Sequence, residues 1–127
     1  MTALLALPII APDVDDDFKP TGKRLFIRPR AVAVAEQFSA VERDFIVTTT
    51  DGDQHFARLT DADIKVLVDD LDFELMSLVG GGSLLVRAWA VDSVEEANGH
   101  LHVTTIGGEL HAILDDDGAP FWRRVAA

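Results

Sequence analysis

Three of the four histidines lie close together near the C-terminal end of the chain, with an acidic residue among them. An H-x-H pair on a β-strand places both imidazole rings on one face of a sheet, and we expect His111 to lie diagonally across a hairpin from His102. Imidazole and carboxylate groups together suit zinc, nickel or iron. The sequence therefore offers one candidate metal site, formed by His100, His102, Glu109 and His111.

The same histidines also have a structural interpretation. With a two-residue turn at Gly107-Gly108, His111 faces Thr104 across the hairpin. In an earlier segment of similar sequence, His55 faces Thr48 in the same way. A position shared by both copies is better explained by a cross-strand His–Thr pair than by a metal ligand. We favour this interpretation and expect no cofactor.

The basic residues concentrate at Lys23, Arg24, Arg28 and Arg30, around the apolar segment 25–27. The alternation of charged and apolar residues predicts a strand. Such a strand could contact an anion such as the phosphate backbone of a nucleic acid. We favour the alternative that the charges guard an edge strand against unwanted pairing.

An apolar segment begins the chain and is followed by four aspartates between residues 13 and 17. It could be a terminal strand that caps the domain's own core, or an arm that docks on a neighbouring subunit. We divide the chain into this arm, residues 1–22, and a single domain, residues 23–127. The residues that would form the assembly contact are Leu4, Leu5, Leu7, Ile9 and Ile10.

The sequence carries no catalytic fingerprint. Because cysteine is absent, disulfides, thiolate nucleophiles and thiolate metal sites are excluded. No G-x-S-x-G, H-E-x-x-H or dinucleotide-binding motif occurs, and the acidic clusters lack the spacing of a calcium loop. We therefore expect a protein that is not an enzyme, and the lack of cysteine favours a cytoplasmic location.

The charge of the chain restricts its partners. The 127 residues carry 22 acidic and 11 basic side chains, a net charge of −11. Such a surface repels both DNA and anionic membranes, so we do not expect nucleic acid or a membrane as a partner. The N-terminal apolar run is too short for a membrane span and lacks the basic residues of a signal peptide.

A repeated pattern organises the chain. The motif R-A-x-A-V begins at Arg30 and at Arg87, and V-T-T-x-x-G-[D/E]-x-H begins at Val47 and at Val103. The first motif recurs after 57 positions and the second after 56, so we infer that one residue was lost between them. The repeats, at about 24–59 and 83–114, indicate a duplicated strand-plus-hairpin unit.

Local signals place the elements of each unit. Asp51-Gly52 predicts a two-residue type I′ turn, which puts Phe45 and Phe56 on one apolar face. Thr60 can cap a helix that ends before the three glycines at 80–82. We predict an α+β fold of mainly antiparallel β-structure, with two duplicated units and one helix between them. The expected core residues are Phe45, Val47, Phe56, Leu67, Leu71, Trp89, Leu101 and Val103.

This order of elements resembles the LytTR-type domain of response regulators, and the first half also resembles small FlbD-type flagellar proteins. The segments that carry the resemblance are Ala31–Glu36, Phe45–Leu59, Thr60–Leu71, Val91–Glu96 and Leu101–Ile113. The resemblance implies a mainly β fold with a helix after the third strand. It also implies DNA binding through a basic segment between the helix and the second unit, but Phe73–Val79 contains no basic residue. We therefore transfer no functional residue.

These observations lead us to expect a non-catalytic protein-interaction or self-assembly module, whose partner is a second copy or another protein. The first alternative is a LytTR-like, nucleic-acid-linked transcriptional regulator. The second is a small metal-binding protein that uses the histidine and glutamate set.

Overall fold

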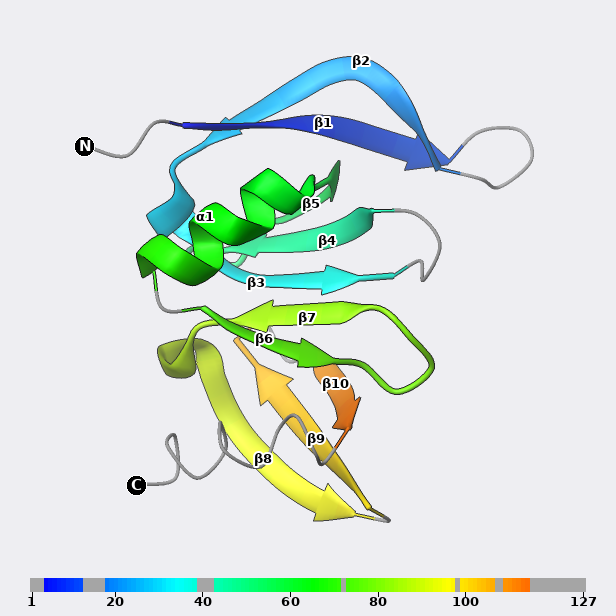
Figure 1. Ribbon diagram of the computed structural model, residues 1–127, viewed down its shortest axis with the longest axis vertical. Coiled ribbons are helices and arrows are strands. Elements are labelled where there is room, and N and C mark those ends of the chain that lie inside the picture. The colour runs from blue at the N-terminus through cyan, green and yellow to red at the C-terminus, as the bar shows by residue number, and fades with distance from the viewer. Residues whose placement is uncertain are drawn as a thin grey trace.

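The computed structural model describes residues 4–12, 18–38, 43–71, 73–97, 99–106 and 109–114. In this part of the chain, ten strands form two antiparallel sheets, and one α-helix lies against the larger sheet (Figure 1), which confirms the predicted α+β class. The elements follow in the order β1 (Leu5–Pro12), β2 (Phe18–Ile27), the 3-10 turn η1 (Pro29–Ala31), β3 (Val32–Gln37), β4 (Asp44–Thr49), β5 (Gln54–Arg58), α1 (Asp61–Leu71), β6 (Glu74–Ser77), β7 (Ser83–Val86), the 3-10 turn η2 (Ala88–Ala90), β8 (Val91–Ala97), β9 (His100–Thr105) and β10 (Leu110–Leu114).

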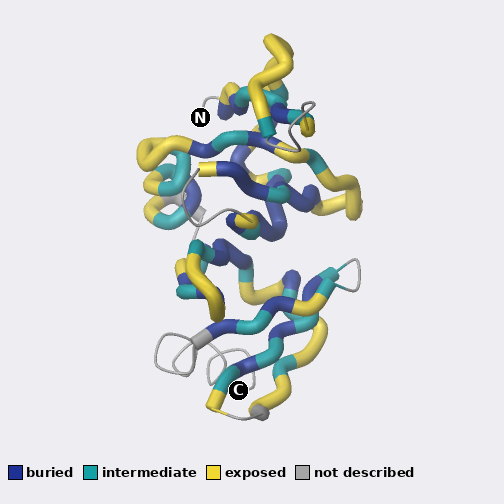
Figure 2. The backbone as a smooth tube through the Cα atoms, turned by 90° about the vertical axis from the view of Figure 1, so that its right-hand side faces the viewer, coloured by how far each residue is buried: buried dark blue, intermediate teal, exposed yellow. Residues whose placement is uncertain are grey.

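The larger sheet has seven strands in the order β2-β1-β5-β4-β3-β7-β6, and the smaller has three in the order β10-β9-β8. Helix α1 packs on the larger sheet through Leu67, which is fully buried with Phe45 and Val47. It begins with a reciprocal cap, because Thr60 and Asp63 hydrogen-bond each other's backbone N–H groups. Figure 2 shows that the inner strands are mostly buried, whereas β2 at the sheet edge is mostly exposed.

The duplication is confirmed, and each copy is larger than the sequence pattern indicates. Each unit consists of a hairpin (β1–β2 or β6–β7), a 3-10 turn and a three-strand meander. A β-bulge interrupts the first pairing of both meanders, after Val32 in one and after Val91 in the other. The antiparallel bridge between Ile9 and Ala57 in the first unit is matched by a bridge between Leu78 and Ile113 in the second.

The structural offset between the units differs from the one that the motifs suggest. The hairpins keep the offset of 56, so Thr49 in the first unit corresponds to Thr105 in the second. Val32 pairs with Thr49 and Val91 pairs with Thr105, so these two valines correspond at an offset of 59. The connection after the first meander strand is therefore three residues shorter in the second unit. Our inference of a single lost residue is wrong, because R-A-x-A-V aligns residues that the fold does not make equivalent.

Both hairpin registers differ by one residue from the prediction. Val47 lies opposite His55, and Phe45 lies opposite Ala57. The Gly52 N–H donates to the Thr49 carbonyl, and Gly52 has a φ of 92°. This geometry is a three-residue loop with glycine in the left-handed region, in place of a type I′ turn. The Thr49 hydroxyl also donates to the Asp51 carboxylate, which lowers the pKa of Asp51 below its ordinary value.

The one-residue slip changes which side chains reach the core. Phe56 lies opposite Ile46, on the sheet face that points away from the core, and is 43% exposed. Trp89 lies in η2 and not in a strand, and is 52% exposed. Both predictions of burial are therefore wrong. The side chain of Leu71 lies outside the described residues. The predicted core residues that are buried are Phe45, Val47, Leu67, Leu101 and Val103.

The N-terminal apolar segment belongs to the larger sheet as β1, between β2 and β5. Leu5, Leu7 and Ile10 are buried within this chain, Ile9 is partly buried, and Leu4 is exposed. The structure thus places the segment as a strand of its own domain, the first of the two interpretations given above. The domain boundary that we drew after residue 22 falls inside β2.

The turn between β6 and β7 allows a matched stability test. Gly80 and Gly82 both have a φ of 91°, but a Cβ at Gly82 would lie 3.3 Å from the Gln37 carbonyl oxygen, whereas a Cβ at Gly80 would meet nothing within 4 Å. We expect Gly80→Ala to lower the free energy of unfolding by about 1 kcal/mol through backbone strain. Gly82→Ala should cost roughly 1 kcal/mol more, because β3 must move. Urea unfolding measures the two free energies of unfolding. Equal losses in the two variants would mean that Gln37 moves away from the new Cβ atom at no cost.

Candidate nucleic-acid interface

His111 points into the protein, where it joins the two sheets. Its ring is almost fully buried, with Nδ1 2.6 Å from Oε2 of Glu36 on β3 and Nε2 3.1 Å from Oγ1 of Thr105 on β9. The predicted partner was Thr104, and the one-residue slip of the hairpin accounts for the change. Sequence reasoning missed Glu36, which lies 75 positions away in the chain.

The candidate metal ligands do not come together. Among the residues that the structure describes, no group of three or more histidine, aspartate or glutamate side chains is placed to hold a metal ion. His111 instead bonds Glu36 and Thr105, while His100 and His102 are partly buried on β9. The Nδ1 atom of His100 is buried without a hydrogen-bond partner in the described part of the chain. The structure therefore shows no assembled site for His100, His102, Glu109 and His111.

The basic residues predicted to contact an anion are all exposed, and one neighbour joins them. Residues 19–30 contain five lysines and arginines and no acidic residue. None of the five has an ion-pair partner among the described residues. Elsewhere, Arg43, Arg58 and Lys65 form salt bridges with aspartates at 2.6 to 2.8 Å. We call the unpaired set the basic edge: Lys19, Lys23, Arg24, Arg28 and Arg30.

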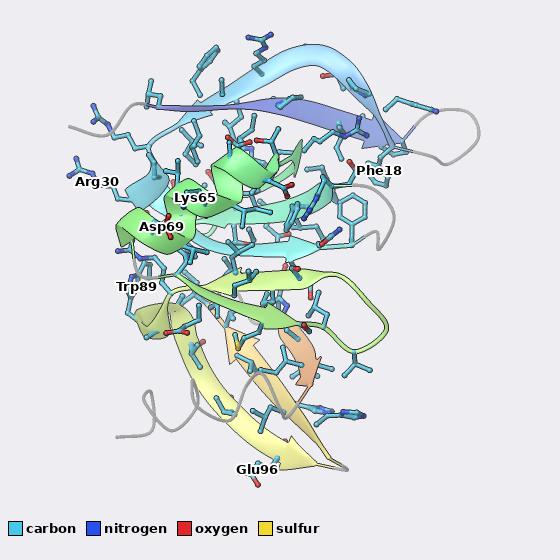
Figure 3. All side chains as sticks on the ribbon, in the orientation of Figure 1. Phe18, Arg30, Lys65, Asp69, Trp89 and Glu96 are labelled. Atoms are coloured by element: carbon cyan, nitrogen blue, oxygen red, sulfur yellow. The ribbon has the colours of Figure 1, made fainter. Side chains whose placement is uncertain are left out.

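The fold explains why these side chains are exposed. β2 is an outer strand of the seven-stranded sheet, as the edge-strand interpretation requires. Leu25 and Ile27 turn toward the core, whereas Arg24 and Phe26 are exposed on the opposite face. The basic edge continues from β2 onto η1, where Arg30 projects from the side of the molecule (Figure 3).

Strand β8 carries exposed acidic side chains and runs away from the basic edge. Asp92, Glu95 and Glu96 are exposed on β8, and Glu96 lies at the tip farthest from the basic edge (Figure 3). The net charge of −11 is a sum over the whole chain, within which residues 19–30 carry only basic charges.

The fold defined by these elements is that of a LytTR-type domain. Among solved structures, the chain is similar to a protein described as the LytTr DNA-binding domain of a methyl-accepting/DNA response regulator from Bacillus cereus. The TM-score is 0.59 at 11% sequence identity, and the match covers 100% of this chain and 99% of that chain. No protein family model and no curated protein matches the sequence. The likeness confirms the fold-level resemblance to LytTR domains and leaves the FlbD resemblance untested.

This likeness corrects two expectations. It contradicts the expected protein-interaction or self-assembly module, with its homo-oligomer or protein partner, because the matching domain is a DNA-binding one. It equally contradicts our exclusion of nucleic acid as a partner. That exclusion rested on the net charge, which does not describe the local surface. Within the described residues, no helix is long and apolar enough to cross a membrane.

Proposed function

We propose that the chain is a DNA-binding domain of a cytoplasmic transcriptional regulator and that the basic edge contacts the phosphate backbone. The observation that carries the proposal is the set of five exposed basic side chains between residues 19 and 30, which have no ion-pair partner among the described residues. The likeness to a LytTr DNA-binding domain supports it.

The acidic remainder of the chain is compatible with DNA binding at this edge. At physiological ionic strength, charges in water are largely screened beyond about 8 Å. A phosphate at Arg28 or Arg30 therefore interacts mainly with nearby charges, and Glu96 at the end of β8 lies at the far tip. Lys65 and Asp69 on α1 largely offset each other, since their charged atoms are 2.7 Å apart.

Salt dependence distinguishes this mode of binding. Each phosphate contact releases counterions, and the logarithm of affinity falls by about 0.9 per contact for each tenfold rise in salt. If all five residues contact phosphates, the logarithm of affinity plotted against the logarithm of salt concentration should have a slope of about −4.5. The affinity should therefore fall roughly 500-fold between about 50 and 200 mM salt.

A pair of double variants tests the assignment. We expect Arg28→Ala/Arg30→Ala to weaken duplex binding about tenfold at moderate salt and to reduce the salt slope by about 2. Fluorescence anisotropy of a labelled duplex measures both values. The matched control is Arg43→Ala/Lys65→Ala, which removes the same charge from residues that are already paired. Equal losses in both variants, or wild-type binding that is independent of salt, would contradict the proposal.

A further inference from the structure

The two 3-10 turns occupy equivalent positions in the duplicated units and meet at one side of the molecule. In η1 the Ala31 N–H donates to the Arg28 carbonyl, and in η2 the Ala90 N–H donates to the Arg87 carbonyl, both at 2.9 Å. Arg87 is thus the counterpart of Arg28, and by the same offset Trp89 is the counterpart of Arg30. The first unit presents a guanidinium where the second presents an indole ring.

Arg87 connects the turns directly. Its Nη1 atom donates to the Arg30 carbonyl at 3.1 Å, so the second unit holds the backbone of η1. Its guanidinium carbon lies 5.7 Å from the centre of the Phe73 ring and 5.4 Å from that of Trp89. Both distances are within the range of cation–π attraction. Through these contacts, Arg87 positions both η1 and Trp89.

Trp89 is held in place and yet faces water. Arg87 covers one side of its indole, but the residue remains 52% exposed. Figure 3 shows Trp89 and Arg30 projecting from the same side of the molecule. A single exposed apolar residue needs no explanation. With Trp89 and Arg30 on one side of the molecule, and Arg30 without an ion-pair partner among the described residues, polar and apolar contacts can be made together on this surface.

We propose that Trp89 is a second contact for duplex DNA, so that the DNA surface spans both units; this inference rests on the function proposed above. Arg28 and Arg30 bind phosphates, and the indole makes apolar contact with the sugars and base edges of the adjacent groove. We favour a duplex as the ligand because the contacts come from two neighbouring turns. Proteins that bind single strands instead use a groove that tracks the backbone, with several aromatic side chains on which successive bases stack. Arg87 is a positioning residue.

The intrinsic fluorescence of Trp89 reports this contact. The chain has two tryptophans, and Trp122→Phe leaves Trp89 as the sole indole. Titration of this variant with an unlabelled duplex should change the Trp89 emission. The change should saturate at the concentration found from the anisotropy of a labelled duplex. DNA binding without any change in the emission would overturn the inference and leave the proposed function standing.

Substitution of the ring gives the second readout. We expect Trp89→Ala to weaken duplex binding about tenfold, the scale of one good aromatic contact, without change in the salt slope, because no phosphate contact is lost. Trp89→Phe should retain most of the affinity. Leu110→Ala, which removes another exposed apolar side chain, from β10, should retain all of it.

The outcomes separate the two proposals. If wild-type protein does not bind DNA, the proposed function and this inference both fail. If Arg30→Ala lowers the salt slope but Trp89→Ala binds like wild type, only this inference fails. Stronger binding to a single strand than to the duplex of the same sequence would also overturn it.

Discussion

Phe45→Ala should lower the free energy of unfolding by about 4 kcal/mol, whereas Phe56→Ala should lower it by less than about 1 kcal/mol. Phe45 is fully buried opposite Ala57, in the cluster on which α1 packs. Removing its ring leaves a cavity that the surrounding strands and helix fill only in part. Urea unfolding of the two variants, which lose the same atoms, measures the contrast.

Phe56 serves as the matched control because it lies on the adjacent strand and is 43% exposed. Its ring is 5.4 Å from that of Phe18 and 5.8 Å from that of Phe38, and these surface contacts account for the small expected loss. In the register predicted from Asp51-Gly52, both phenylalanines would share the core face. Equal losses would therefore support the type I′ turn and contradict the three-residue loop.

Most of the elements were predictable from the sequence because their signals are local. The exception is β6, since α1 ends at Leu71 and residues 74–77, which we expected before the end of the helix, form a strand. Alternating apolar residues indicated most of the strands, and Thr60 indicated the start of α1. The register was not predictable, because Asp-Gly fits both a two-residue and a three-residue loop. Hydrogen bonds of Thr49 with Asp51 and Asp53 select the longer loop, and a slip of one residue turns Phe56 outward.

The candidate site was predictable to a similar extent. Four residues of the basic edge are close in sequence, so they were identified at once, and Lys19 was missed because it stands apart from them. The roles of Arg87 and Trp89 were not predictable, since the bond from Arg87 to Arg30 spans 57 positions. The expectation against DNA rested on the sum of charges over the whole chain, and the likeness to a DNA-binding domain contradicts it.

His111→Ala should lower the free energy of unfolding by about 3 kcal/mol, the lower end of the range for breaking a buried charged or hydrogen-bonded pair. The variant leaves the Glu36 carboxylate and the Thr105 hydroxyl without the ring that they contact at 2.6 and 3.1 Å. The Glu36 side chain is 25% exposed, so water can hydrogen-bond the carboxylate in the variant and offset part of the lost free energy. We therefore expect a destabilisation at the lower end of the range.

The duplication supplies the control for this prediction, because His55 occupies the position in the first unit that His111 occupies in the second. His55 is only partly buried, and we expect His55→Ala to cost less than about 1 kcal/mol. Glu36→Gln retains an acceptor for the ring N–H and should cost less than His111→Ala. Since Glu36 and His111 belong to different sheets, the His111→Ala loss measures how strongly the two sheets stabilise each other. Similar losses for His55→Ala and His111→Ala would show that the contact between the sheets contributes nothing beyond local packing.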